Sequence, residues 1–131
     1  MSIGLWVRGA RPKTLATSIA SVMVGAAMAY VHIEQSGTCI AIYPEPASCA
    51  TAREQQTLLM DRFWPVTILC LLVALFLQIA VNYANDYSDG IRGTDAGRDT
   101  DESKSGKPQR LTASGLVPAK HVLFAAMICA A

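Results

Sequence analysis

The sequence predicts an all-α integral membrane protein, a helical bundle with two full transmembrane helices and the start of a third. Three observations support this fold class. Hydrophobic residues make up 52% of the 131 residues, and they gather into three runs. The mean hydropathy is positive, which is unusual for a soluble domain of this size. The 11 Lys and Arg residues lie outside the runs. We therefore expect residues 1–131 to form a single partial membrane domain.

The cations also predict how the chain is oriented in the membrane. Three precede the first apolar run, two lie between the first and second runs, and six follow the second run. By the positive-inside rule, the N-terminus and the acidic segment after the second run face the cytoplasm, in a multi-pass protein of the plasma membrane. The net charge of +1 provides no basic field of the kind that binds nucleic acid.

The N-terminal third is expected to contain a surface segment and the first span. Residues 1–14 are expected to lie on the cytoplasmic membrane surface, with Pro12 opening the next helix; a flank that only orients the span is the alternative. Residues 15–33 carry no formal charge and come close to the ~20 residues needed to cross a membrane. A secretory signal peptide is the alternative for this run, because residues 27–29 resemble a cleavage site. The run is longer than the ~7–15 apolar residues of a typical signal peptide.

The remaining elements follow in order. Residues 34–63 form the outer connection, in which 51–62 favours a short helix, and Cys39 and Cys49 form a possible disulfide in an oxidising exterior. Residues 64–84 form the second span. Residues 85–121 form a cytoplasmic Asp-rich loop, where glycines such as Gly90 are expected to break the helix. Residues 122–131 start a third span and cover about half a crossing.

The acidic residues after the second apolar run predict a metal and phosphate site. If the helix continues from residue 79 to 90, Asn82, Asp86 and Asp89 stand at i, i+4 and i+7 on one face. Carboxylates at the end of a membrane helix are costly and usually functional. Mg²⁺ takes oxygen ligands and commonly bridges one or two carboxylates to substrate phosphates. We therefore expect Asp86, Asp89 and Asp95 to be catalytic residues that hold Mg²⁺.

Further polar residues are expected to hold the substrate. They are Asn82, Asn85, Lys107 and Arg110. The two cations suit the remaining phosphate charge, and Arg110 can bind it in bidentate fashion. A pyrophosphate held beside an apolar membrane cavity indicates a lipid pyrophosphate as the substrate. A solvated helix end is the alternative interpretation. The spacing does not match an EF-hand calcium loop.

Three blocks of the sequence resemble the UbiA superfamily of membrane prenyltransferases, and within it the menaquinone branch. The blocks are ARPKTL at 10–15, QIAVNYANDYSDGIRGTD at 78–95 and RLTASGL at 110–116. The resemblance implies a nine-helix fold around a central cavity. Its first Asp-rich motif, here Asn82, Asp86, Asp89 and Asp95, would hold Mg²⁺ and a polyprenyl pyrophosphate.

The resemblance also implies the reaction. The polyprenyl pyrophosphate ionises, the ring of 1,4-dihydroxy-2-naphthoate attacks, and the ring loses its carboxylate. The family has a second Asp-rich motif, which is not among these 131 residues. We therefore expect the chain to be the N-terminal part of such an enzyme and to be inactive alone.

Two other function classes fit parts of the sequence. A CDP-alcohol phosphotransferase motif begins D-x-x-D-G, as residues 86–90 do, but Gly93 and Thr94 stand where that motif has Ala and Arg. A small non-catalytic membrane subunit is favoured by the length of the chain and disfavoured by the long match over residues 78–95.

Overall fold

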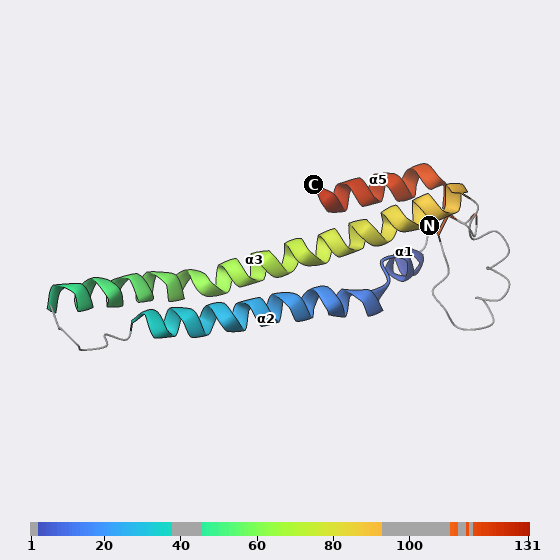
Figure 1. Ribbon diagram of the computed structural model, residues 1–131. Helices are drawn as coiled ribbons and strands as arrows, with labels where there is room; N and C mark the ends of the chain where they lie inside the picture. The colour runs from blue at the N-terminus through green and yellow to red at the C-terminus, as the bar shows by residue number, and fades with distance from the viewer. Residues whose placement is uncertain (1–2, 38–45, 93–110, 113–114, 116) are drawn as a thin grey trace. The chain divides into compact units, whose positions relative to one another are not determined.

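The computed structural model describes residues 3–37, 46–92, 111–112, 115 and 117–131, without the side chains of residues 46–48. This part of the chain is helical and has no strand, which confirms the all-α fold class. The helices are α1 (Ile3–Gly9), α2 (Pro12–Ser36), α3 (Pro46–Arg92) and α5 (Ala119–Ala130) (Figure 1). The prediction that Pro12 opens a helix is also confirmed.

Helices α2 and α3 are long and apolar enough to cross a membrane. The share of buried residues in their apolar segments is 0% for α2 and 6% for α3. The core helix of a soluble protein would be mostly buried, so the exposed apolar side chains of α2 and α3 fit a membrane protein.

Both helices extend beyond the apolar runs that predicted them. Helix α2 reaches Ser36, and α3 starts at Pro46 and includes the segment 51–62 that we expected as a separate helix. Hydropathy marks the apolar part of a helix and not its ends, because a helix can continue into polar surroundings. The predicted limits of the spans, 15–33 and 64–84, lie inside the helices and stay predictions.

The expected helix break at Gly90 is wrong, since α3 continues through it to Arg92. A side chain at this position would collide with Thr112, because a Cβ on Gly90 would lie 2.5 Å from the Thr112 Cβ. Gly90 therefore allows the segment at residue 112 to pack closely against the helix. The weak helix propensity of glycine does not end the helix at this position.

The chain divides into two compact units, and the first comprises residues 1–18 and 74–131. Its core contains Tyr83, Leu111, Val117, Val122 and Ala126, with Leu5 and Trp6 of α1 packed against it. These contacts place α5 along the C-terminal part of α3, as Figure 1 shows. The candidate site lies in this unit.

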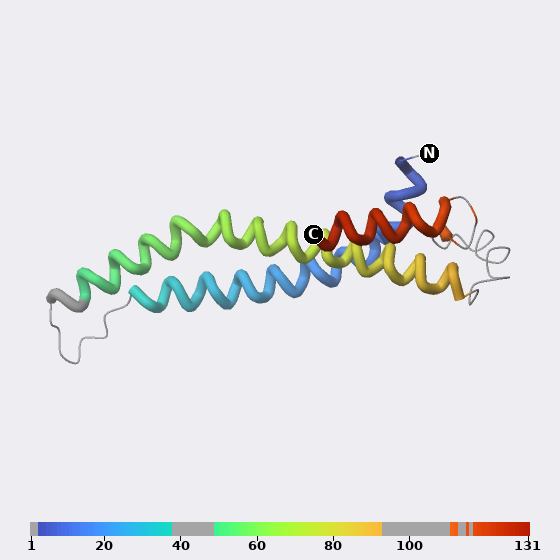
Figure 2. The backbone as a smooth tube through the Cα atoms, turned by 90° about the horizontal axis from the view of Figure 1, so that it is seen from above, coloured from blue at the N-terminus to red at the C-terminus, as the bar shows by residue number. Residues whose placement is uncertain are grey.

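The second unit comprises residues 19–73, where α2 and α3 run side by side (Figure 2). Two contacts join the helices near the chain connection between them. The Gln56 Nε2 donates a hydrogen bond to the Glu34 carbonyl oxygen at 3.2 Å, and the rings of Tyr30 and Phe63 meet edge to face with centroids 5.5 Å apart. Cys49 forms a disulfide, but its predicted partner Cys39 lies outside the described residues, so that pairing stays a prediction.

Candidate functional site

The candidate site is built on one buried face near the C-terminal end of α3. Asn82 is 4% exposed and Asp86 is 2% exposed, and Asp89 is half-buried one turn further on. Because α3 is continuous through residue 92, the predicted spacing of i, i+4 and i+7 holds on this helix. Asn85 is exposed, so it does not belong to this buried face.

The amide of Asn82 joins α3 to the corner between α1 and α2. Its Nδ2 donates to the Ala10 carbonyl oxygen at 2.8 Å and to the Thr14 Oγ1 at 2.9 Å. An amide nitrogen carries only two hydrogens, so both donors of Asn82 are used within the chain. The Oδ1 accepts a longer bond of 3.5 Å from the Gln78 Nε2. With both donors used, only the Oδ1 of Asn82 remains to contact a ligand, and an acceptor oxygen suits a cation better than a phosphate.

The corner that Asn82 holds has an unusual backbone. Arg11 has a φ of +52°, a left-handed conformation that costs a residue other than glycine about 1–2 kcal/mol. The Arg11 carbonyl oxygen accepts two bonds from Thr14, one from its N–H at 2.9 Å and one from its Oγ1 at 2.9 Å. Here α1 turns away from α2, as Figure 2 shows. These bonds, together with those from Asn82, hold the chain in this conformation.

The carboxylate of Asp86 joins α3 to the segment before α5. Its Oδ2 accepts a hydrogen bond of 2.8 Å from the backbone N–H of Leu111, which is fully buried. A buried carboxylate is stable only with such donors, and backbone N–H groups are good partners for it. The Leu111 carbonyl oxygen in turn accepts from the Val117 N–H at 3.3 Å. Asp86 therefore fixes the position of the turn that leads into α5.

Aromatic and apolar side chains pack beside this polar face. The Tyr83 hydroxyl donates to the Trp6 carbonyl oxygen at 3.0 Å, and the two rings meet edge to face with centroids 5.6 Å apart. Gly9 is buried here, and a Cβ on it would lie 2.5 Å from the Leu111 Cδ1. Helix α1 is thereby held against α3 by packing as well as by hydrogen bonds.

The structure brings together the three sequence blocks that carry the family resemblance. Asn82 of the second block bonds Ala10 and Thr14 of the first, and Asp86 bonds Leu111 of the third. The blocks are far apart in the chain, at separations of 72, 68 and 25 residues for these three bonds. They therefore form one site in space.

Three predicted residues, Asp95, Lys107 and Arg110, lie outside the described residues. Within the described part of the chain, no three His, Cys, Asp or Glu side chains come together as a metal site would require. The described donors are the carboxylates of Asp86 and Asp89 and the amide oxygen of Asn82. All are oxygen donors of the type that Mg²⁺ prefers.

Sequence reasoning missed two members of this site, Thr14 and the backbone N–H of Leu111. The one signal for Thr14 is its place in the block at 10–15. Its residue type does not distinguish it from a threonine at an ordinary helix start. A backbone N–H is common to all residues except proline, so no sequence pattern could have identified Leu111 as the partner of Asp86.

Comparison with known proteins identifies relatives of this chain. It is 39% identical over 127 residues to a 1,4-dihydroxy-2-naphthoate octaprenyltransferase of Mycobacterium tuberculosis, a match that covers 96% of this chain and 32% of the relative. The chain is a relative of the 1,4-dihydroxy-2-naphthoate prenyltransferases. The proteins of the same name from Mycobacterium leprae and Haemophilus influenzae are 35% and 30% identical to it.

The match to these prenyltransferases extends over nearly the whole chain. It covers 97% of the chain for the M. leprae protein and 90% for the H. influenzae protein, but 32% and 28% of those proteins. The chain thus spans about a third of the length of the curated relatives it matches. No protein-family profile matches it. No solved structure matches it either. The resemblance predicted from the three blocks is confirmed.

Proposed function

We propose that this chain supplies the polyprenyl-pyrophosphate side of a prenyltransferase site. The reaction transfers a polyprenyl group from an allylic pyrophosphate to 1,4-dihydroxy-2-naphthoate, with loss of the ring carboxylate, in menaquinone biosynthesis. One observation carries the proposal: the blocks shared with the family meet at Asn82 and Asp86. The names of the three relatives supply the reaction class and the aromatic acceptor.

The donor set on α3 suits Mg²⁺. Two carboxylates one turn apart and an amide oxygen one turn before them are hard ligands, and Asp95 is the proposed third carboxylate. When bound, Mg²⁺ supplies positive charge that stabilises the charge growing on the leaving pyrophosphate. The hydrogen bonds of Asn82 and Asp86 hold these side chains in place beforehand, so binding requires little rearrangement.

Cations in the following segment are proposed to bind the pyrophosphate. Arg110 directly precedes Leu111 in the chain, and the Leu111 N–H is bonded to Asp86. This neighbourhood supports a role for the Arg110 guanidinium, and Lys107 lies three residues earlier. Bidentate bonds from an arginine to phosphate oxygens would orient the leaving group for departure.

The surroundings suit a substrate with a long apolar tail. Large apolar side chains along α3 are exposed, including Leu72 at 46%, Phe76 at 52% and Val81 at 52%, so the helix presents a lipid-like environment next to the polar face. We propose that the chain lies in the plasma membrane with this end of α3 at the cytoplasmic side, in agreement with the positive-inside rule. A dry apolar setting also keeps water from the reacting carbon.

The proposal is tested by transferring this chain into a relative. The matching segment of the M. tuberculosis protein is replaced by residues 1–131, and prenylation of 1,4-dihydroxy-2-naphthoate is measured in membranes with a polyprenyl pyrophosphate and Mg²⁺. We expect Asp86→Asn and Asp89→Asn each to lower the rate by about 10²-fold or more, as the loss of a group that stabilises transition-state charge does. Asp61→Asn, an exposed acid on the same helix, is the matched control.

The choice of asparagine separates charge from structure. Asn at position 86 keeps an oxygen that can accept from the Leu111 N–H, so the turn stays anchored while the ligand charge is lost. Full activity of both variants would overturn the proposal and favour a structural subunit. Transfer from a labelled CDP-alcohol by the same membranes, without prenylation, would favour a phosphotransferase instead.

A further inference from the structure

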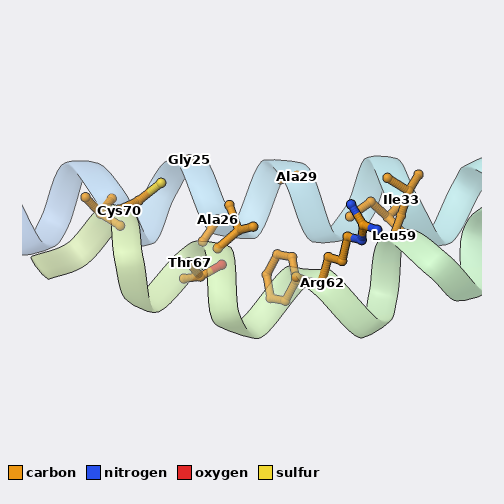
Figure 3. A pocket seen from close by; sticks show the side chains of 11 residues that line it. Gly25, Ala26, Ala29, Ile33, Leu59, Arg62, Thr67 and Cys70 are labelled. Atoms are coloured by element: carbon orange, nitrogen blue, oxygen red, sulfur yellow. The ribbon is translucent and has the colours of Figure 1, made fainter. Parts of the chain in front are cut away.

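The two long helices form an apolar groove within the second unit, and none of its lining residues belongs to the acidic face. The groove has a volume of about 470 Å³ and is lined by small residues of α2 (Gly25, Ala26 and Ala29) and by Phe63, Thr67 and Cys70 of α3. Figure 3 shows these two sets of side chains on facing helices, with Arg62 reaching across toward α2 near Ile33. We call it the α2–α3 groove.

Contacts hold the two helices together at one end of the groove, and small residues of α2 leave the space between the helices beyond that end. Gln56 and Glu34 join the helices by a hydrogen bond, and Tyr30 packs on Phe63. Further from this end, α2 lines the groove with Ala29, Ala26 and Gly25 before Val22, and a Cβ added to Gly25 would meet nothing within 4 Å. The groove volume lies within the range of about 300–1,000 Å³ that is typical of ligand pockets, and it is roughly half the volume of a large pocket.

Aromatic side chains indicate the depth of the groove in the membrane. Tyr30, Phe63 and Trp64 form a chain of edge-to-face contacts, with centroids 5.5 Å and 5.4 Å apart, and Trp64 is 66% exposed. Tyr and Trp gather at the boundary between head groups and acyl chains. Arg62 is next to this aromatic level in sequence. Cys70 lies about 12 Å deeper, at ~1.5 Å per residue along the helix.

The only charged residue that lines the groove, among those the structure describes, is Arg62. Its side chain is exposed and makes no ion pair with a described residue. A guanidinium at the head-group level beside an apolar groove suits a phospholipid. The planar guanidinium binds the phosphate, and the groove accepts a hydrocarbon chain. A helix seated in the groove would instead bury this cation among apolar side chains unless it brought an acid.

We infer that the α2–α3 groove binds one acyl chain of an anionic phospholipid, and that Arg62 binds its phosphate. The lipid belongs to the leaflet on the side of the connection between α2 and α3. This binding is independent of the proposed prenyl transfer, because none of its residues belongs to the acidic face.

The test uses phosphatidylglycerol with a photoactivatable group in the middle of one acyl chain, incorporated into bilayer nanodiscs that hold the full chain. After illumination, labelled peptides are mapped by mass spectrometry. We expect labelling to concentrate on the lining residues Gly25, Ala26, Ala29, Val66, Thr67 and Cys70 and to be weaker on the exposed residues 72–73, which lie outside the groove. An even distribution over all exposed apolar residues would overturn the inference.

Two pairs of variants test each part of the ligand. Arg62→Gln should lower groove labelling about fivefold, the effect expected for one cation near an anionic lipid surface, and Arg53→Gln is the control for an exposed cation outside the groove. Gly25→Leu should fill the groove and lower labelling by a similar or larger factor, whereas Ala27→Leu, exposed and outside it, should not. Circular dichroism establishes that each variant remains helical.

Three outcomes would contradict the inference. Arg62→Gln could lower labelling no more than Arg53→Gln does, which would show that Arg62 does not bind the lipid phosphate. The label could attach instead to a second copy of the chain seated in the groove, which would make it a helix-packing surface. An excess of polyprenyl pyrophosphate could abolish groove labelling, which would identify the occupant as a prenyl chain. In each of these cases the effect of Asp86→Asn on prenylation would be unchanged, so the two proposals fail separately.

Discussion

Replacing Asn82 by alanine should release the corner between α1 and α2 while leaving both helices formed. The variant loses two hydrogen bonds from the Asn82 Nδ2, of 2.8 Å and 2.9 Å. Each is worth about 0.5–1.5 kcal/mol in net terms, so the local free energy of opening should fall by about 1–3 kcal/mol. The left-handed φ of +52° at Arg11 adds to the tendency to open, because the Asn82 bonds are among the contacts that hold this conformation.

Amide hydrogen exchange measures this opening directly. The N–H groups of Ala10 and Thr14 are bonded to the carbonyl oxygens of Trp6 and Arg11, both at 2.9 Å. In Asn82→Ala, these two amides should exchange about 5- to 150-fold faster, the factor that corresponds to about 1–3 kcal/mol. Amides in the middle of α2, such as that of Met23, should keep their rates.

Matched variants at the corner separate this effect from a general loss of stability. Thr14→Ser keeps a hydroxyl that can accept from Asn82 and should leave exchange nearly unchanged. Thr17→Ala removes a hydroxyl that bonds only to the Thr14 carbonyl oxygen in the described structure, with no partner on α3. If Asn82→Ala accelerates exchange no more than Thr17→Ala does, then the Asn82 bonds do not hold the corner and our account of the site is wrong.

Two further predictions concern how α1 packs on α3. Gly9→Ala should destabilise the packing of α1 by about 1–2 kcal/mol, because the new Cβ would lie 2.5 Å from the Leu111 Cδ1, whereas Gly25→Ala should have no such cost. The thermal midpoint in detergent distinguishes them, and equal midpoints would refute the predicted overlap. Tyr83→Phe should cost about 1 kcal/mol, because it loses the 3.0 Å bond to the Trp6 carbonyl oxygen but keeps the ring contact. The near-ultraviolet circular dichroism of the aromatic side chains should stay close to that of the parent, because the Trp6–Tyr83 ring contact is kept. Loss of that signal would contradict the prediction that this ring contact survives without the hydrogen bond.

The sequence predicted what depends on the periodicity and polarity of single segments. The helix through Asn82, Asp86 and Asp89 follows from an apolar run that leads into polar residues at helical spacing, and the structure contains it as predicted. The prediction at Gly90 was wrong because it used only the local helix propensity of glycine, whereas the close approach of Thr112 to this residue depends on a segment further along the chain. The helices also extend beyond the predicted spans, since hydropathy reports the apolar part of a helix and not its backbone hydrogen bonds.

The partners of the site residues could not be predicted for a different reason. Asn82 bonds the backbone of Ala10, and Asp86 bonds the backbone of Leu111. Main-chain groups are the same at almost every position, so residue types do not identify which ones will meet. What the sequence did contain was the three separate blocks, and only the fold shows that they lie together.

The side chains that we propose as cation ligands, Asn82 and Asp86, also hold the helices together through their hydrogen bonds. Asp86 accepts from Leu111 through Oδ2, and an ionised carboxylate has about four lone-pair positions, so it can bind a cation without releasing that bond. Asn82 is similar, because its nitrogen donates both hydrogen bonds to the corner between α1 and α2 while its oxygen can act as an acceptor. A cation bound by these two side chains would therefore also stabilise the junction of α1, α3 and the turn before α5. A bound cation should increase the order of this junction and its removal should decrease that order, because the same side chains serve both.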